Sequence, residues 1–335
     1  MPTLHPRKTI ILLVIFIVAV FAAIWYFSAF GAPQKSAEPE RFIIGLGLGQ
    51  SATMEKLQSD GFIKNQFAFK LALFIKGGDK VKPGGYQISK SMNAWTLAKV
   101  LTAEPYMKWV IIPEGRRKEQ IVDLLAENLG WSDTIKEKWV SVDTAEKSDY
   151  LEGVYFPDTY LIPIDEPPLN VANRLINRFN EKFAPLLAEA QKQNVKWTTA
   201  VKIASLIERE TGGKEDMPLI SGIIWNRLLK NMKLDIDATV QYARDTLLYA
   251  DSPETIVAWW APITPEDKAI DSKYNTYKYT GLPPRPISNP GLDSLNAVLY
   301  PEKTDCFYYL HGADKKIHCA KTYEEHKDNI EKYLK

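Results

Sequence analysis

The stretch TTAVKIASLIERETGG, Thr198 to Gly213, predicts the helix around which the rest of the chain is organised. At about 100° per residue, its apolar side chains share one face of that helix. They are Ala200, Ile203, Ala204 and Ile207. The opposite face carries Lys202, Ser205 and Arg209. Glu208 falls on the flank of the apolar stripe and Glu210 falls near Leu206, so we expect both carboxyl groups to point inward or along the wall of a groove.

The two glutamates allow two interpretations. Burial of an ionised carboxylate is costly, so a glutamate on a half-apolar wall is either paired or holds its proton at a raised pKa. A glutamate that holds its proton is what general acid catalysis requires. The alternative is an ordinary helix end, with both glutamates solvated or one of them in a structural ion pair. The candidate partners of that pair are Lys202, Arg209 and Lys214.

Three longer motifs, in order along the chain, resemble a known family. They are IASLIERET (203–211), SGIIWNRLLKNMKLDIDATVQYA (221–243) and YNTYKYTGLPPRPISNPG (274–291). They resemble the endolytic murein transglycosylases of the MltG, or YceG-like, type, and the likeness runs from about Arg41 to Tyr333. In that family the first glutamate of the A-S-x-x-E-x-E-T motif is the catalytic acid/base. The resemblance therefore assigns this role to Glu208.

The resemblance implies a membrane-anchored lytic transglycosylase acting on peptidoglycan glycan strands. Such an enzyme cleaves the β-1,4 bond between N-acetylmuramic acid and N-acetylglucosamine, and leaves a 1,6-anhydro end that terminates nascent strands. One carboxyl suffices, because the attacking 6-hydroxyl belongs to the substrate and is already close to the reacting carbon. Glu208 would protonate the leaving oxygen and then accept the hydroxyl proton. We assign Glu210 to orientation or charge tuning.

Two other functions compete with this expectation. An ordinary muramidase would use Glu208 as the acid and Glu210 or Asp237 as a second carboxylate, and its product would contain an added water. A non-catalytic glycan-binding scaffold would hold peptidoglycan without releasing a soluble product. The intact A-S-x-x-E-x-E-T motif argues against a scaffold.

The other motifs supply candidates for substrate binding or orientation. Asp237 is either the N-cap of a helix that begins at Ala238, which is the simpler interpretation, or a cleft residue. Two departures from the family's L-Q-[ST]-D-[AP]-T-V-Q-Y pattern, Asp235 and Ile236, put the contacts made there in doubt. The full set of candidates is Glu210, Asn226, Asp237, Gln241, Tyr242, Asn275, Thr276 and Tyr277. We expect the last three of these to face the substrate, although they could instead stabilise their own loop.

An uninterrupted apolar run from Thr9 to Phe30 is long enough to cross about 30 Å of hydrocarbon as a helix. Its length and the lack of a clean A-x-A site favour an uncleaved anchor over a signal peptide. Arg7 and Lys8 precede it, so the positive-inside rule places residues 1–8 in the cytoplasm and the rest of the chain outside the inner membrane.

The remaining chain predicts an α+β fold. Residues 41–105 form a βααβ unit that resembles the LysM-like subdomain of the family, and the resemblance makes residues 106–335 a mixed catalytic domain that carries the acid on a helix. Residues 31–40, GAPQKSAEPE, have the composition of a tether that lifts the domain off the bilayer. By its resemblance, the subdomain contacts glycan, or it only supports the catalytic domain. The family also implies association with peptidoglycan synthases.

Charge and metal-binding patterns exclude other classes. With 42 basic and 41 acidic residues, the chain gives no electrostatic case for a nucleic-acid partner. The histidines at 311, 318 and 326 lack metal-binding spacing, so we expect neither a metal nor another cofactor. Cys306 and Cys319 flank two predicted strands, and a disulfide between them depends on the register of the turn.

Overall fold

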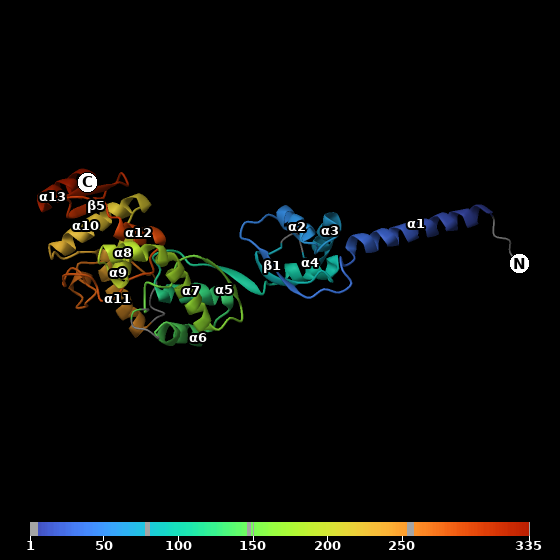
Figure 1. Ribbon diagram of the computed structural model, residues 1–335, viewed down its shortest axis with the longest axis horizontal. Helices are drawn as coiled ribbons and strands as arrows, with labels where there is room; N and C mark the ends of the chain where they lie inside the picture. The colour runs from blue at the N-terminus through green and yellow to red at the C-terminus, as the bar shows by residue number, and fades with distance from the viewer. Residues whose placement is uncertain (1–5, 78–80, 146–148, 150, 253–257, 335) are drawn as a thin grey trace. The chain divides into compact units, whose positions relative to one another are not determined.

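The computed structural model of the protein describes residues 6–77, 81–145, 149, 151–252 and 258–334. Helices and strands are mixed along the chain, as expected from the sequence (Figure 1). The chain divides into two compact units. The first unit contains residues 1–110 and 160–165, and the second unit contains residues 111–159 and 166–335.

The first helix, α1 (Pro6–Phe30), contains the apolar run Thr9–Phe30, whose mean hydropathy is 3.0. Within the described part of the chain, it is the helix whose length and composition suit a membrane span. Its side chains are exposed from Thr9 to Ser28, as contact with lipid requires. These properties support a single-pass anchor. Most of the tail predicted for residues 1–8 lies outside the described residues.

The first unit follows the βααβ order expected from the sequence. Its elements are β1 (Glu40–Ile44), α2 (Gln50–Ser59), α3 (Gln66–Gly77) and β2 (Gly84–Ile88), followed by α4 (Ala94–Thr102) and β3 (Met107–Ile111). β1 and β2 pair antiparallel, with Phe42 opposite Tyr86. The sheet order is β1-β2-β3-β4, where β4 (Thr159–Pro163) comes from much later in the chain. The unit extends past residue 105 because β3 and β4 complete its sheet.

Residues 31–40 are fastened to the first unit. The Gln34 N–H donates to the carbonyl of Lys90 at 3.0 Å, and the Ser89 hydroxyl donates to the carbonyl of Ala37 at 2.6 Å. The Lys90 ammonium also lies 3.1 Å from the Glu40 carboxylate. The tether expected from composition is therefore bonded to the first unit, because the chain that follows β2 offers partners that its composition does not reveal.

The second unit is mainly helical. Its helices are α5 (Lys118–Leu129), α6 (Asp133–Lys138), α7 (Pro168–Phe183), α8 (Leu187–Lys192), α9 (Trp197–Glu210), α10 (Met217–Leu229), α11 (Asp237–Asp251), α12 (Leu292–Leu299) and α13 (Tyr323–Tyr333). The amphipathic pattern of residues 170–193 predicts a single helix, but α7 ends at Phe183, where a 3₁₀ turn (Ala184–Leu186) leads into α8. Pro185 explains the interruption, because proline removes a backbone donor from a helix interior.

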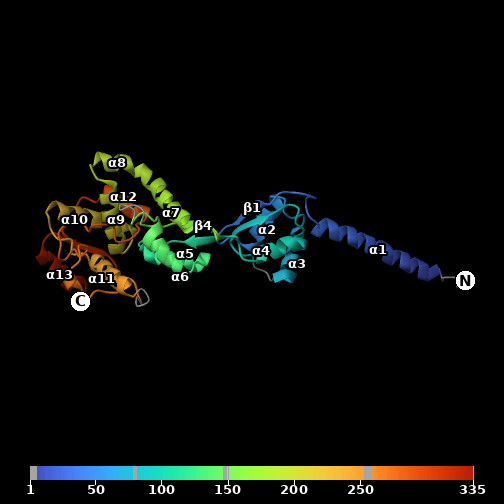
Figure 2. The same ribbon diagram turned by 90° about the horizontal axis from the view of Figure 1, so that it is seen from below.

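Helix α9 lies at the centre of the second unit, among α8, α10, α11 and α12 (Figure 1; Figure 2). It is buried almost all round, as is typical of a core helix. The prediction that Ser205 lies on a polar face is wrong, since Ser205 is fully buried. Its hydroxyl accepts the N–H of Ile287 at 3.1 Å, so the loop that precedes α12 closes over this face.

The C-terminal hairpin consists of β5 (Tyr308–His311) and β6 (Ile317–Ala320), which pair antiparallel and pack against α13. Tyr309 lies opposite Cys319. Cys306 and Cys319 form a disulfide, which settles the alternative that the sequence left open.

Candidate active site

Glu208 lies in the last turn of α9, and one of its two carboxylate oxygens is fixed. Oε2 accepts the N–H of Gly291 at 3.0 Å and the hydroxyl of Ser294 at 2.7 Å. Gly291 directly precedes α12, so the carboxylate lies at a helix N-terminus, which attracts negative charge. From the residues that the structure describes, Oε1 accepts no hydrogen bond. The side chain is half-buried, so Oε1 is available to a ligand.

A second carboxyl group, that of Glu114, lies beside Glu208. Glu114 packs so closely on Gly291 that a side chain at that position would collide with its carboxylate. Its neighbour Gly115 has φ +72°, and a Cβ there would lie 3.4 Å from Cγ of Glu208. Partial burial and the charge of Glu208 raise the pKa of Glu114, and the ammonium of Lys214 opposes this shift.

Sequence reasoning missed Glu114. In the sequence, Pro113 and Gly115 indicate only a break between an extended run and a helix, whereas the structure shows that their turn carries an acidic side chain to the end of α9. A charged residue between a proline and a glycine, at the point where a strand gives way to a helix, is the signal that could have found it.

Arg209 and Trp260 form the next part of this surface. The Arg209 guanidinium lies 4.2 Å from the centroid of the Trp260 ring, within cation–π range. Burial and the nearby Arg116 lower the pKa of Arg209. Its buried Nε has no hydrogen-bond partner among the described residues. Sequence reasoning missed Trp260 as well, because Trp260 lies beyond the end of α11 and is held in place by Gln241 and Asp245 of that helix.

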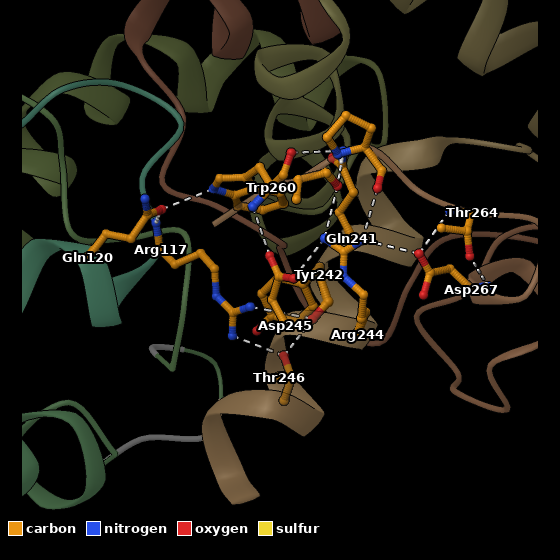
Figure 3. Close-up of polar contacts among 12 residues, drawn as sticks. Arg117, Gln120, Gln241, Tyr242, Arg244, Asp245, Thr246, Trp260, Thr264 and Asp267 are labelled. Carbon is orange, nitrogen blue, oxygen red and sulfur yellow. Dashed lines mark hydrogen bonds and ion pairs between the residues drawn. The ribbon is translucent and has the colours of Figure 1, made fainter. Parts of the chain in front are cut away.

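Trp260 is held by several contacts in an unusual backbone conformation, with φ +61°. Its N–H donates to Asp245 at 2.8 Å, and its indole Nε1–H donates to Gln120 at 3.0 Å (Figure 3). The Gln241 amide donates to the Trp260 carbonyl at 3.1 Å. Such strain persists only where surrounding contacts fix it, and it is typical of functional sites.

Glu210 points to the other side of the end of α9, into a cavity of about 700 Å³. Tyr309 donates its hydroxyl proton to Glu210 at 2.6 Å, and burial raises the pKa of this carboxyl group. The walls are rich in aromatic and charged groups. They include Arg209, Arg227, Asp237, Gln241, Lys268, Tyr277, Tyr308, Tyr309, His311, Tyr323 and His326. Glu208 is not among the residues that line this cavity, so the two glutamates of the motif serve different surfaces.

The comparisons with known proteins agree with the motifs. The family model described as the YceG-like family matches residues 42–332. A Bacillus subtilis (strain 168) protein named endolytic murein transglycosylase is 31% identical over 316 residues, which cover 86% of this chain and 83% of that protein. The chain belongs to the YceG-like family.

Further relatives of this YceG-like chain include a protein of the same name from Streptococcus pneumoniae (serotype 2, strain D39). It is 26% identical over 311 residues, which cover 83% of this chain and 55% of that longer protein. A 2.6 Å crystal structure of a YceG-like protein from Listeria monocytogenes matches with a TM-score of 0.59 at 27% identity. That match covers 88% of this chain and 99% of the other.

Asp237 and Tyr277 of the YceG-like chain meet in the cavity wall. The Tyr277 hydroxyl donates to Oδ1 of Asp237 at 2.6 Å. The prediction that Asp237 is an N-cap is wrong, because α11 begins at Asp237 itself, with Ile236 as its N-cap residue. Its carboxylate instead accepts the hydrogen bond from the Tyr277 hydroxyl.

The expectation that Asn275 and Thr276 face the substrate is wrong, because both side chains are fully buried. The Asn275 amide donates to the carbonyls of Lys268 at 3.0 Å and Ile270 at 2.8 Å. The Thr276 hydroxyl lies 2.9 Å from that of Thr239 on α11. Both side chains stabilise the loop that presents Tyr277.

Asn226 and Tyr242 also lie behind the site. The Asn226 amide donates to the carbonyls of Thr304 at 2.8 Å and Cys306 at 3.0 Å, which ties α10 to the disulfide segment. Tyr242 is buried, and its ring packs 4.1 Å beneath the Arg117 guanidinium (Figure 3). Neither residue is among those that line the cavity.

Proposed function

We propose that the protein is a membrane-anchored endolytic lytic transglycosylase that uses Glu208 as its acid/base. The names of its relatives and the match over residues 42–332 support this function. The observation that carries the role of Glu208 is the asymmetry of its carboxyl group. Two donors hold Oε2, while Oε1 is free to meet a sugar.

In this mechanism the exchangeable proton belongs on Oε1, since Oε2 already accepts two hydrogen bonds. Oε1–H protonates the glycosidic oxygen as the bond between N-acetylmuramic acid and N-acetylglucosamine breaks. The resulting carboxylate then accepts the proton of the muramyl 6-hydroxyl, which closes on the anomeric carbon to give the 1,6-anhydro end. No water is consumed, and Glu208 regains its proton for the next cycle. Gly291 and Ser294 keep the carboxyl group in place throughout.

The other candidate residues divide into two groups in this proposal. Glu210, Asp237, Gln241 and Tyr277 bind or orient glycan in the cavity wall, where aromatic faces and carboxylates suit sugar rings and hydroxyls. Asn226, Tyr242, Asn275 and Thr276 position these walls from behind.

Several expectations complete the proposal. The N-terminus lies in the cytoplasm and both folded units lie outside the inner membrane, as Arg7 and Lys8 before the apolar run Thr9–Phe30 favour. The LysM-like subdomain contacts glycan, and the enzyme works beside peptidoglycan synthases. No cofactor takes part.

The test is product analysis of purified peptidoglycan treated with the full chain in detergent. Mass spectrometry should find 1,6-anhydro ends with the wild-type protein and none with Glu208→Gln, whose circular dichroism should match the wild type. Undiminished release of anhydro products by Glu208→Gln would overturn the assignment.

Hydrolysis is the second candidate, and the position of Glu114 favours keeping it. A hydrolase needs a second carboxylate near its acid. Glu210 and Asp237 were the residues first considered for that role, and both line the cavity near Tyr309. Glu114 instead lies beside Glu208. Products heavier by one water than the anhydro form would identify a muramidase with Glu114 as its second carboxylate.

A further inference from the structure

Helix α3 has an apolar face on each side. Its inner face, Ala68, Phe69, Ala72 and Leu73, is fully buried in the core of the first unit. The opposite face carries Phe67, Leu71, Phe74 and Ile75, and we call it the outer face of α3. Phe67 and Phe74 are 67% and 66% exposed, and Ile75 is 59% exposed. A helix that is apolar all round is normally buried, so this face needs an explanation.

The end of α1 is built into the same unit. Ala29 and Phe30 belong to its buried core, and the Phe30 ring stacks on Trp95 with centroids 5.2 Å apart. The Trp95 indole N–H donates to the Tyr26 hydroxyl at 3.0 Å. Tryptophan and tyrosine at the end of a membrane span mark the headgroup level. The headgroup region therefore extends to the first unit, and no linker separates this unit from the end of the span.

Helix α3 lies next to this point. It contacts α1 and packs along α4, the helix that carries Trp95, and both views show it beside the end of α1 (Figure 1; Figure 2). Lys64, just before α3, and Lys70 on it are exposed, and Lys64 lies close to Gly31 at the exit of α1. Lysines beside an apolar face extend their ammonium groups to lipid phosphates.

We propose that the outer face of α3 docks on the lipid surface of the bilayer that α1 crosses. Phe67, Leu71, Phe74 and Ile75 enter the boundary between headgroups and acyl chains, and Lys64 and Lys70 contact phosphates. This inference depends on the membrane span of the proposed function, and not on the chemistry at Glu208.

The experiment uses the full chain in nanodiscs of phosphatidylethanolamine and phosphatidylglycerol, labelled at single cysteines with an environment-sensitive fluorophore. Both native cysteines form the disulfide, so an introduced thiol is labelled selectively. Reporters at Phe74→Cys and Phe67→Cys test the outer face. Val18→Cys reports on the span, and Glu55→Cys, exposed on α2, is the water-exposed reference. Brominated lipid and aqueous iodide serve as the two quenchers.

We expect brominated lipid to quench the Phe67 and Phe74 reporters several-fold more than the Glu55 reporter. Iodide should quench them less. If they behave like the Glu55 reporter while the Val18 reporter is quenched by lipid, the docking is wrong and the anchor stands. If iodide also quenches the Val18 reporter, the span fails and the docking fails with it.

Discussion

The hydroxyl of Ser294 donates a 2.7 Å hydrogen bond to Oε2 of Glu208, although 86 positions separate the two residues in the chain. The bond joins the end of α9 to the first turn of α12. Ser294 is fully buried, so water does not compete for its hydroxyl. The orientation of the proposed catalytic carboxyl group thus depends on a residue from a distant motif.

Ser294→Ala should lower kcat while the fold is retained. Loss of one of the two donors to Oε2 loosens the carboxyl group, and we expect a decrease of about tenfold, equivalent to about 1.4 kcal/mol. Release of anhydro muropeptides over time measures the effect. Ser221→Ala is the matched control, because that serine is equally buried and its hydroxyl has no partner among the described residues. Equal rates for the two variants would contradict the positioning role.

Glu208→Gln should lower the pKa of Glu114. Partial burial and the charge of Glu208 raise the pKa of Glu114 in the wild type, and a neutral amide at position 208 removes the second of these causes. Carbon-13 NMR titration of the Glu114 carboxyl group, in the wild type and in Glu208→Gln, measures the difference. An equal pKa of Glu114 in the two proteins would show that the two groups do not interact.

Glu152 should make the protein less stable as pH rises. It is buried, accepts the Asn289 amide at 2.5 Å, and burial raises its pKa from 4.5 to about 8. The unfolded chain ionises this group above about pH 4.5 while the folded chain keeps it neutral, so stability is lost between the two values. Glu152→Gln should remove this loss, which is at most roughly 3 kcal/mol at pH 7.

Urea unfolding at pH 5 and pH 8 measures the difference between wild type and Glu152→Gln. The variant should gain on the wild type as pH rises. Equal pH dependence of the two proteins would mean that Glu152 is ionised in the folded state. Glu152→Ala serves as a contrast, because it leaves the Lys118 N–H without its acceptor and removes one of the two acceptors of the Asn289 amide, so it should destabilise at both pH values.

Reduction of the disulfide should destabilise the C-terminal hairpin and weaken the cavity. Cys306 and Cys319 close a short loop, for which a cost of about 3 kcal/mol is typical. Because Tyr309 on this hairpin donates to Glu210, activity should fall at temperatures where the hairpin opens. Thermal inactivation with and without dithiothreitol measures this. A double variant, Cys306→Ser with Cys319→Ser, should be insensitive to the reductant.

The sequence predicted those helices and strands whose formation depends on residues close together in the chain. The apolar period located α9, and the apolar run from Thr9 to Phe30 located α1. Predictions for single side chains failed where the contacting residue is distant in the sequence. Ser205 looked polar on the helical wheel, yet the loop at Ile287 covers it. Asp237 looked like a cap, yet Tyr277 supplies the donor that its carboxylate uses.

The sequence likewise predicted only part of the candidate site. The family motif pointed to Glu208, but no periodicity could show that Gly291 and Ser294 hold it or that Glu114 faces it. These neighbours come from two separate segments, which meet the end of α9 only in the fold. For the same reason Asn275 and Thr276, conspicuous in the sequence, lie inside their loop.

The bonds that fasten Gln34, Ala37 and Glu40 have a mechanical consequence. Because both ends of residues 31–40 are held, extra residues inserted between Pro33 and Ala37 would form a loop on the surface of the first unit. They would not move the first unit away from the end of α1. The spacing between α1 and this unit is thus set by folded structure, and a longer connector would leave that spacing unchanged.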